Sequence, residues 1–385
     1  ETPSVVVTTA LDVVDPFDGL ISLREAIDYA GSAYTQNGRS VEVGRTITFA
    51  PQLAGGVLQL ESTLEFGKTV TIDATGLAGG LKLVGGDNFG VLKVNAGDLA
   101  GQQTVLAGLA ITGGVADTGA GVYHAGGNLM LLNCSIYGNT GASGVGVRSD
   151  AGALKLVNCT IAGNVASYAY GGVYSIGGAV TLHNTIVAEN TVNGSSAVDF
   201  FVANIADMQS SLIGVASIQV ATNHNGARGN LVGVPGSAID PGFVDVAKYD
   251  FTLGKTASGS VSPAINAGTN VLTVYPNGVV PSYDASGALR FVGGVVDIGA
   301  YESPMGPTEM PSTIVTTVDD VVDAYDGLIS LREAVAYANN YNLGSTITFA
   351  ASINGSTLYL NDSLTLETDL VIDGLANGAQ GFVLT

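Results

Sequence analysis

Three stretches of the chain repeat one pattern: GVYHAGGNLMLLNCSIYGN at 121–139, GVRSDAGALKLVNCTIAGN at 146–164 and GVYSIGGAVTLHNTIVAEN at 172–190. Their first residues, Gly121, Gly146 and Gly172, are 25 and 26 positions apart. Short runs in each stretch alternate apolar and polar residues, which is typical of a strand. A fixed period near 25 residues indicates one turn of a solenoid per repeat. The pattern therefore predicts an all-β chain wound as a right-handed parallel β-helix.

Equivalent positions of the three stretches carry similar side chains, and stacked coils place such positions in files along the helix axis. We expect apolar files inside the helix. At one turn we expect a file of asparagines whose amides hydrogen-bond from coil to coil. The first apolar file is Val122, Val147 and Val173, the second is Leu131, Leu156 and Leu182, and the asparagines are Asn133, Asn158 and Asn184.

Another file is expected to point outward. It consists of Tyr123, Arg148 and Tyr174, with His124, Ser149 and Ser175 beside it. Aromatic rings in such a file suit a sugar-binding strip, whereas an ordinary solvated surface is the simpler interpretation. Both stay open at this point.

A second, much longer repeat joins the two ends of the chain. The stretch VVVTTALDVVDPFDGLISLREAIDYA at 5–30 returns as TIVTTVDDVVDAYDGLISLREAVAYA at 313–338, an offset of 308 residues. We expect a complete β-helix module at 1–302, a proline-rich linker at 303–312 and the start of a second module at 313–385. The second copy stops inside an expected strand, whose open edge is a template for pairing. The sequence thus predicts a tandem array or association with another subunit.

Each copy carries a helix start signal. Ser22 followed by Glu25 forms a capping box, and the next apolar residues share one face of a helix expected at about 22–30. Ser330 opens the same pattern in the second copy. A short amphipathic helix can shield the open end of a β-helix, although a partner-binding role is an alternative.

Aspartates precede both helices at intervals of three residues. They are Asp12, Asp15 and Asp18 in the first copy, and Asp320, Asp323 and Asp326 in the second. Carboxylates in this spacing could gather around Ca²⁺, the one cofactor that the sequence suggests. The alternative is that they form turns and place negative charge near a helix N-terminus.

Composition excludes several classes of protein. The chain has 13 Lys+Arg and 33 Asp+Glu, a formal net charge of −20, which excludes a protein that tracks nucleic-acid phosphates. No apolar run approaches the roughly 18 residues that a membrane-spanning helix needs. The acidic, lysine-poor composition favours a secreted or surface protein. Cys134 and Cys159 fall at equivalent positions of neighbouring coils, about 4.8 Å apart and so within the Cα range of a disulfide. We expect two buried, reduced thiols, with a disulfide as the alternative.

Enzymes on this kind of scaffold need carboxylates clustered on neighbouring coils. The expected register stacks Asp117 over Ala142 and Ser167, so no acidic file forms there. Asp150 shares its turn only with Arg148. We therefore expect no enzymatic activity, with a polysaccharide lyase or glycoside hydrolase as the less favoured alternative.

Several segments resemble bacterial surface proteins. They are DGLISLREAIDYA at 18–30, GNLVG at 229–233, DPGF at 240–243, SPAINAG at 262–268 and VDIGAYE at 296–302. The chain resembles the choice-of-anchor Q domain proteins, and its NCTIAGN coil at 158–164 is also similar to the polymorphic outer-membrane β-helix proteins. The resemblance implies an extracellular or cell-surface location and no particular catalytic residues.

The sequence thus predicts a structural or adhesive element of a bacterial cell surface. We expect an extended stalk or fibre of tandem β-helix modules that associates end to end. A carbohydrate-binding adhesin, with a surface glycan as partner, is the alternative function.

Overall fold

The computed structural model describes residues 2–31, 34–36, 39–41, 46–96, 102–196, 198–270, 281–290, 295–304, 312–320, 322, 327–341, 346–375 and 383–385. The chain divides into two compact units, Glu1–Ser303 (unit 1) and Pro304–Thr385 (unit 2). Each unit is described by itself.

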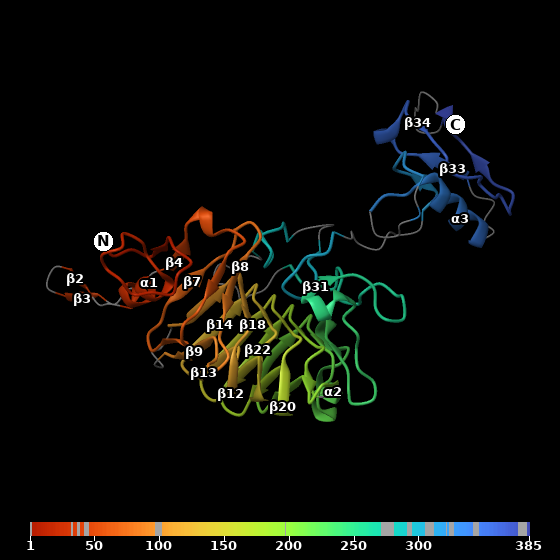
Figure 1. Ribbon diagram of the computed structural model, residues 1–385. Coiled ribbons are helices and arrows are strands. Elements are labelled where there is room, and N and C mark those ends of the chain that lie inside the picture. The colour runs from red at the N-terminus through yellow and green to blue at the C-terminus, as the bar shows by residue number, and fades with distance from the viewer. Residues whose placement is uncertain are drawn as a thin grey trace. The chain divides into compact units, whose positions relative to one another are not determined.

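Unit 1 is a right-handed parallel β-helix, and the stacked coils of the chain make about 11 turns. Strands of successive coils lie side by side in parallel, as β14, β18 and β22 do in Figure 1. The fold predicted from the 25-residue period is therefore confirmed.

Four sheets run along the axis of unit 1. Sheet I contains β1 (Val6–Val7), β4 (Thr46–Phe49), β7 (Thr71–Asp73), β10 (Thr104–Ala107), β14 (Asn128–Leu132), β18 (Ala153–Val157), β22 (Ala179–His183) and β27 (Ile205–Gln209). Sheet II contains β5 (Val57–Gln59), β8 (Leu81–Val84), β11 (Leu109–Thr112), β15 (Ser135–Tyr137), β19 (Thr160–Ala162), β23 (Ile186–Val187), β28 (Leu212–Ile213) and β29 (Leu231–Val232). Sheet III contains β12 (Val115–Thr118), β16 (Thr140–Ser143), β20 (Val165–Ala169), β24 (Thr191–Val192) and β25 (Ser195–Ser196). Sheet IV contains β6 (Leu64–Phe66), β9 (Leu92–Asn95), β13 (Val122–Gly126), β17 (Val147–Ser149), β21 (Val173–Ser175) and β26 (Phe200–Val202).

The remaining elements of unit 1 lie outside these sheets. They are α1 (Leu23–Ala30), β2 (Tyr34–Gln36), β3 (Arg39–Val41), η1 (Pro51–Leu53), α2 (Ile218–His224), η2 (Ala227–Gly229), β30 (Phe243–Asp245), η3 (Val246–Lys248) and β31 (Asp250–Leu253). The pairs β2–β3 and β30–β31 are antiparallel.

The predicted apolar files fill the inside of the helix. Val122, Val147 and Val173 are partners in the strand register, and each is fully buried. The file Leu131, Leu156 and Leu182 is likewise in register and buried. Burying one such side chain contributes about 1.5–3 kcal/mol, so the files are a principal source of cohesion between coils. Cys134 and Cys159 are free and buried, as expected.

The asparagine prediction was wrong about which residues form the coil-to-coil chain of amides. Asn133, Asn158 and Asn184 are buried and adopt the left-handed backbone conformation, with φ of 52°, 49° and 48°. The amide of Asn133 donates to the carbonyl of Tyr283 at 2.7 Å, and that of Asn184 donates to Thr269 at 3.0 Å. The two amides therefore bind a later part of the chain.

The chain of amides lies six residues further along each coil. Asn139 donates its side-chain N–H to Asn164 at 2.9 Å, and Asn164 donates to Asn190 at 2.9 Å. Asn190 in turn donates to the carboxylate of Asp199 at 3.0 Å. The other oxygen of Asp199 accepts the backbone N–H of Val215 at 2.9 Å, so donors meet the carboxylate from both sides. A carboxyl group fits this last position because each of its two oxygens can accept a hydrogen bond.

The chain after β29 packs on the outside of sheets I and II. We call residues 240–270, 281–290 and 295–303 the covering segment. Its apolar side chains extend the core: Phe251 packs with Tyr137 and Ala162, Val296 with Met130 and Val157, and Ile298 with Ile186 and Leu212. Asn133 and Asn184 hold its backbone through the hydrogen bonds given for their amides. The outer faces of these two sheets are thus largely interior.

The helix α1 begins as predicted. The hydroxyl of Ser22 accepts the N–H of Glu25, and Glu25 accepts the N–H of Ser22, so the capping box is confirmed. Leu23, Ala26, Ile27 and Ala30 are buried in the main core of unit 1.

Unit 2 has the same opening. It contains β32 (Ile314–Val315), α3 (Leu331–Tyr341), β33 (Thr346–Phe349), η4 (Ala351–Ile353), β34 (Thr357–Leu358), β35 (Val371–Ile372) and β36 (Val383–Leu384). Strand β33 pairs in parallel with β32 and β35. Val315, Leu331 and Ile347 belong to its own small core.

Candidate functional site

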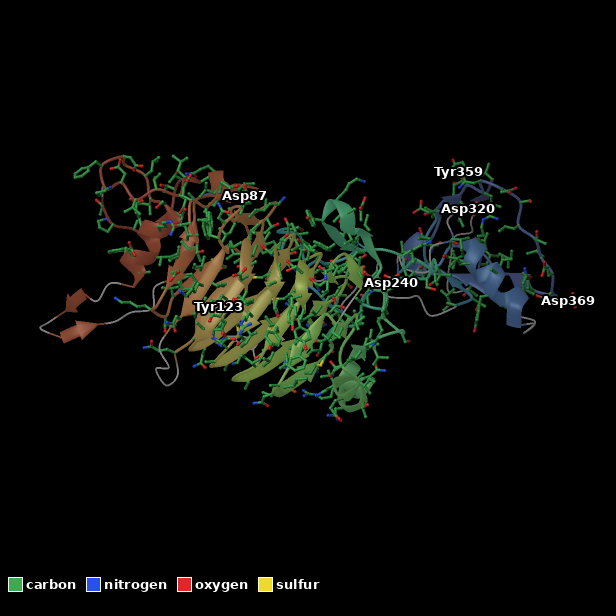
Figure 2. All side chains as sticks on the ribbon, turned by 60° about the horizontal axis from the view of Figure 1, so that its bottom comes forward. Asp87, Tyr123, Asp240, Asp320, Tyr359 and Asp369 are labelled. Carbon is green, nitrogen blue, oxygen red and sulfur yellow. The ribbon has the colours of Figure 1, made fainter. Side chains whose placement is uncertain are left out.

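The outer face of sheet IV carries one continuous file of side chains, which we call the outer strip. Figure 2 shows Tyr123 on the face formed by successive strands. Register pairs join its members one strand at a time, from β6 to β26: Glu65, Lys93, Tyr123, Arg148, Tyr174 and Phe201. The structure thus places the predicted Tyr123, Arg148 and Tyr174 next to one another and extends the file at both ends.

Both cations of the outer strip are paired with carboxylates. The Nζ of Lys93 lies 3.1 Å from the Oε2 of Glu65. The Nε of Arg148 donates to Asp150 at 2.8 Å, and the hydroxyl of Tyr123 donates to the other oxygen of Asp150 at 2.9 Å. This hydrogen bond is the main reason that the pKa of Tyr123 is raised, with burial contributing next. The polar part of the strip is locally neutral and rich in hydrogen-bonding groups.

An aromatic cluster occupies the other end of the strip. The ring of Tyr170 stacks on that of Tyr174, with centroids 4.8 Å apart and an interplanar angle of 13°. Phe201 lies 4.9 Å from Tyr170 and 5.6 Å from Tyr174, and 36% of Phe201 is exposed. The guanidinium of Arg148 lies 5.1 Å from the centroid of the Tyr174 ring. Four side chains thus form a partly exposed platform.

Sequence reasoning missed Tyr170. Its backbone is left-handed, with φ of 54°, at a turn where the two preceding coils have Gly119 and Gly144 with φ of 58° and 59°. A bulky residue seldom adopts this conformation. The signal was present in the sequence, because tyrosine interrupts a file of glycines at the coil period.

His124, Ser149 and Ser175 do not accompany the strip on the surface. They are buried, and the Nδ1 of His124 lies 2.8 Å from the hydroxyl of Ser149. The alternation of the strand explains this correction, since neighbours of an outward residue point inward.

The aspartates before α1 do not converge on one point. Asp12 binds Arg24 at 2.7 Å through both oxygens and accepts the N–H of Glu61. Asp15 and Asp18 each accept a backbone N–H two residues further on, as turn-forming aspartates do. In unit 2, Asp320 binds Arg332 in the same way, whereas Asp323 and Asp326 lie outside the described residues. Over the described ranges, no three His, Cys, Asp or Glu side chains are grouped to hold a metal ion.

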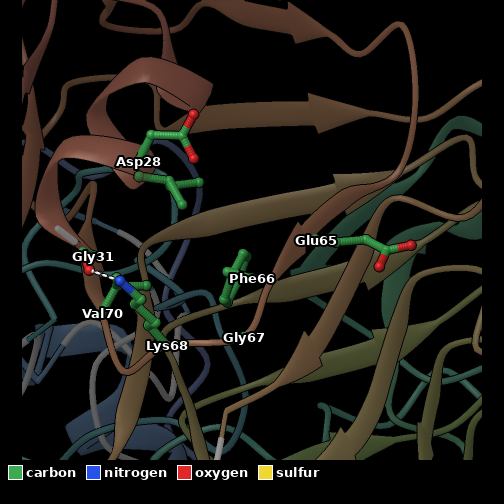
Figure 3. A pocket seen from close by; sticks show the side chains of 8 residues that line it. Asp28, Gly31, Glu65, Phe66, Gly67, Lys68 and Val70 are labelled. Carbon is green, nitrogen blue, oxygen red and sulfur yellow. Dashed lines mark hydrogen bonds between the residues drawn. The ribbon is translucent and has the colours of Figure 1, made fainter.

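A small cavity lies beside the start of the outer strip. It has a volume of about 190 Å³ and is lined by α1, by β6 and by the residues after each of them. Figure 3 shows Asp28, Phe66 and Lys68 around it, with Glu65 at one side. The ammonium group of Lys68 donates to the carbonyl of Gly31. The volume is below the roughly 300 Å³ at which small-molecule sites begin.

Two buried carboxylates stand apart from the strip. Burial raises the pKa of Asp199 to about 7, against the hydrogen bonds from Asn190 and Val215, which lower it. Burial also raises the pKa of Asp297 to about 6 in the covering segment. Asp297 accepts the N–H groups of Asn266 and Ser303, so both carboxylates fix backbone positions.

No family model, curated protein or solved structure matches the chain. Among the helices of the described residues, none is long and apolar enough to cross a membrane.

Proposed function

We propose that the chain is a structural or adhesive element of a bacterial cell surface, built from tandem β-helix modules. The observation that carries this proposal is an arrangement that occurs in both units and that we call the cap. In it, an arginine of the first helix joins an aspartate of the preceding loop to two later backbone carbonyls. In unit 1, Arg24 joins Asp12 to the carbonyls of Ser62 and Thr63. In unit 2, Arg332 joins Asp320 to the carbonyls of Asp362 and Ser363. One chain thus encodes two separate starts of the same solenoid.

Tandem starts favour a role in which length matters. A solenoid gains about 4.8 Å along its axis with each coil, so each added module makes the protein longer. The resemblance to choice-of-anchor Q domain proteins supports a surface location. The net charge of −20 would keep neighbouring shafts apart in solution. End-to-end association of modules is part of the proposal.

Small-angle scattering and negative-stain microscopy test the stalk. The chain would be compared with versions in which residues 1–312 are present two and three times before residues 313–385. We expect the maximum dimension to increase by an equal length with each added module. Compact particles, whose dimension grows only with the cube root of mass, would overturn the proposal.

The outer strip favours a second candidate function, carbohydrate-binding adhesion.

The enzymatic alternative is tested by incubating the chain with acidic and neutral polysaccharides. Release of reducing ends or unsaturated products would replace the structural role with catalysis.

A further inference from the structure

We propose that the outer strip, together with Tyr170, binds a neutral, extended polysaccharide that lies along the axis of the β-helix. This inference deepens the adhesive part of the proposed function. It depends on the outer face of sheet IV and not on the formation of a stalk.

The aromatic platform provides the contact surface. Tyr170, Tyr174 and Phe201 form a cluster whose rings are only partly buried. Clustered rings with hydroxyl groups present apolar area and polar tips together. Sugar rings have the matching character, because their C–H faces are apolar and their edges carry hydroxyl groups.

The backbone of Tyr170 gives an independent reason to suspect binding. At this turn a non-glycine residue costs about 1–2 kcal/mol in the left-handed conformation. Glycine serves at the same turn in two other coils, so the fold does not require tyrosine there. Strained residues of this kind are concentrated at ligand sites. The benefit that offsets the strain is the ring that Tyr170 adds to the platform.

The charges indicate a neutral ligand. Arg148 is paired with Asp150, and Lys93 with Glu65, so no cation of the strip is left to attract an acidic polymer. The whole chain is strongly acidic and would repel one. The hydroxyl of Tyr123, the guanidinium of Arg148 and the carboxylate of Asp150 offer both donors and acceptors. A polyhydroxylated, uncharged molecule matches this set.

The direction of the strip indicates a polymer. Its six residues come from six neighbouring parallel strands. At about 4.8 Å per strand, they extend over roughly 24 Å along the axis. A single sugar would contact only one or two of them.

Affinity electrophoresis tests this proposal with the full chain. Native gels would contain a soluble β-glucan, galactomannan, xylan or α-glucan, or the acidic polygalacturonate and alginate. The variants are Tyr170→Gly, Tyr174→Ala and the double variant. Tyr168→Ala is the matched control, since Tyr168 is exposed and outside the cluster.

We expect at least one neutral polymer to retard the wild-type chain. Loss of one stacking ring should weaken retardation about two- to tenfold, and the double variant should weaken it further. Tyr170→Gly introduces the residue found at this turn in two other coils and relieves the strained backbone, so it should keep or raise the wild-type Tm. Tyr168→Ala should bind like the wild type.

Several results would overturn the inference. They are retardation by the acidic polymers alone, no retardation by any neutral polymer, full binding by the double variant, or equal loss in Tyr168→Ala. Analytical sedimentation of the wild type and of Tyr170→Gly tests whether a second copy of the chain, and not a polysaccharide, occupies the strip. If the variant abolishes self-association, the strip is an interface between copies and not a glycan site. The scattering series that tests the stalk would be unaffected by failure here.

Discussion

The two copies of the opening motif have the same cap but differ in the burial of the coils after it. Leu58 and Leu358 are 2% and 3% exposed in the two units. Ile72 is fully buried, whereas its counterpart Ile372 is 39% exposed. In unit 1, β7 pairs with β4 on one side and β10 on the other. The pairing described for β35 in unit 2 is with β33. The cap is therefore a local structure, whereas burial of a coil depends on its neighbours.

The matched pair Ile72→Ala and Ile372→Ala should show this difference most strongly. Removing a fully buried isoleucine side chain costs about 3–4 kcal/mol. The same change at a partly exposed position should cost about 1 kcal/mol. Urea unfolding followed by circular dichroism and limited proteolysis would measure both. Equal losses would mean that β35 is covered as well as β7.

A rise in pH should destabilise unit 1 through Asp199, whereas acidification should destabilise unit 2 through Asp320. Because the folded pKa of Asp199 is raised to about 7, its neutral form is favoured in the coils of unit 1. The stability that protonated Asp199 adds to the fold is therefore complete below the ordinary carboxyl pKa, and it is lost as the pH rises to about 7. The pKa of Asp320 is lowered, chiefly by Arg332, so its contribution in unit 2 is lost on acidification.

Asp199→Asn isolates the first of these effects. Between about pH 4 and pH 7 the wild type should lose roughly 2–3 kcal/mol relative to the variant. The variant also loses an acceptor for Val215 at every pH, so the slope of the difference is the test. Thermal unfolding across this range measures it. A difference that does not change with pH would show that Asp199 stays ionised in the fold.

The cap itself should respond equally in both units. Arg24→Ala and Arg332→Ala each leave a carboxylate that is only 2% exposed without its bidentate partner. We expect a similar, moderate loss of stability in each case, because each arginine is partly exposed and water can reach the site. Proteolysis rates at the two loops before the helices provide the measurement. A large effect in one unit alone would mean that the cap is not autonomous.

The period explains why so much of the fold could be predicted. Val122, Val147 and Val173 recur at the coil spacing, and a solenoid converts that spacing into direct contact. The capping box at Ser22 depends on four consecutive residues and was equally readable. The chain of amides was not, because each repeat contains two asparagines with the same period. Periodicity alone does not reveal that Asn139 faces Asn164 while Asn133 faces the covering segment.

Non-periodic contacts account for most of the features that sequence reasoning missed. Val296 packs on Val157, which lies more than a hundred residues earlier in the chain, and no local sequence pattern predicts that contact. Only three of the six members of the outer strip were found from the sequence, since Glu65, Lys93 and Phe201 lie in coils with weaker repeats. Tyr170 was overlooked because it departs from the repeat.

The smallest expected effect concerns calcium and the loops before the two helices. Asp15 and Asp18 already accept backbone N–H groups, and Asp12 is occupied by Arg24. We therefore expect Ca²⁺ or EDTA to change the Tm by less than about 1 °C, equivalent to a few tenths of a kcal/mol. Asp12→Asn should lower the Tm to the same extent with and without the ion, because it weakens an ion pair. If Ca²⁺ raises the Tm by several degrees and Asp15→Asn with Asp18→Asn abolishes that rise, the loop gathers its carboxylates around the ion. Unit 2 would then be tested in the same way through Asp323→Asn with Asp326→Asn, and Asp320→Asn would be its ion-pair control.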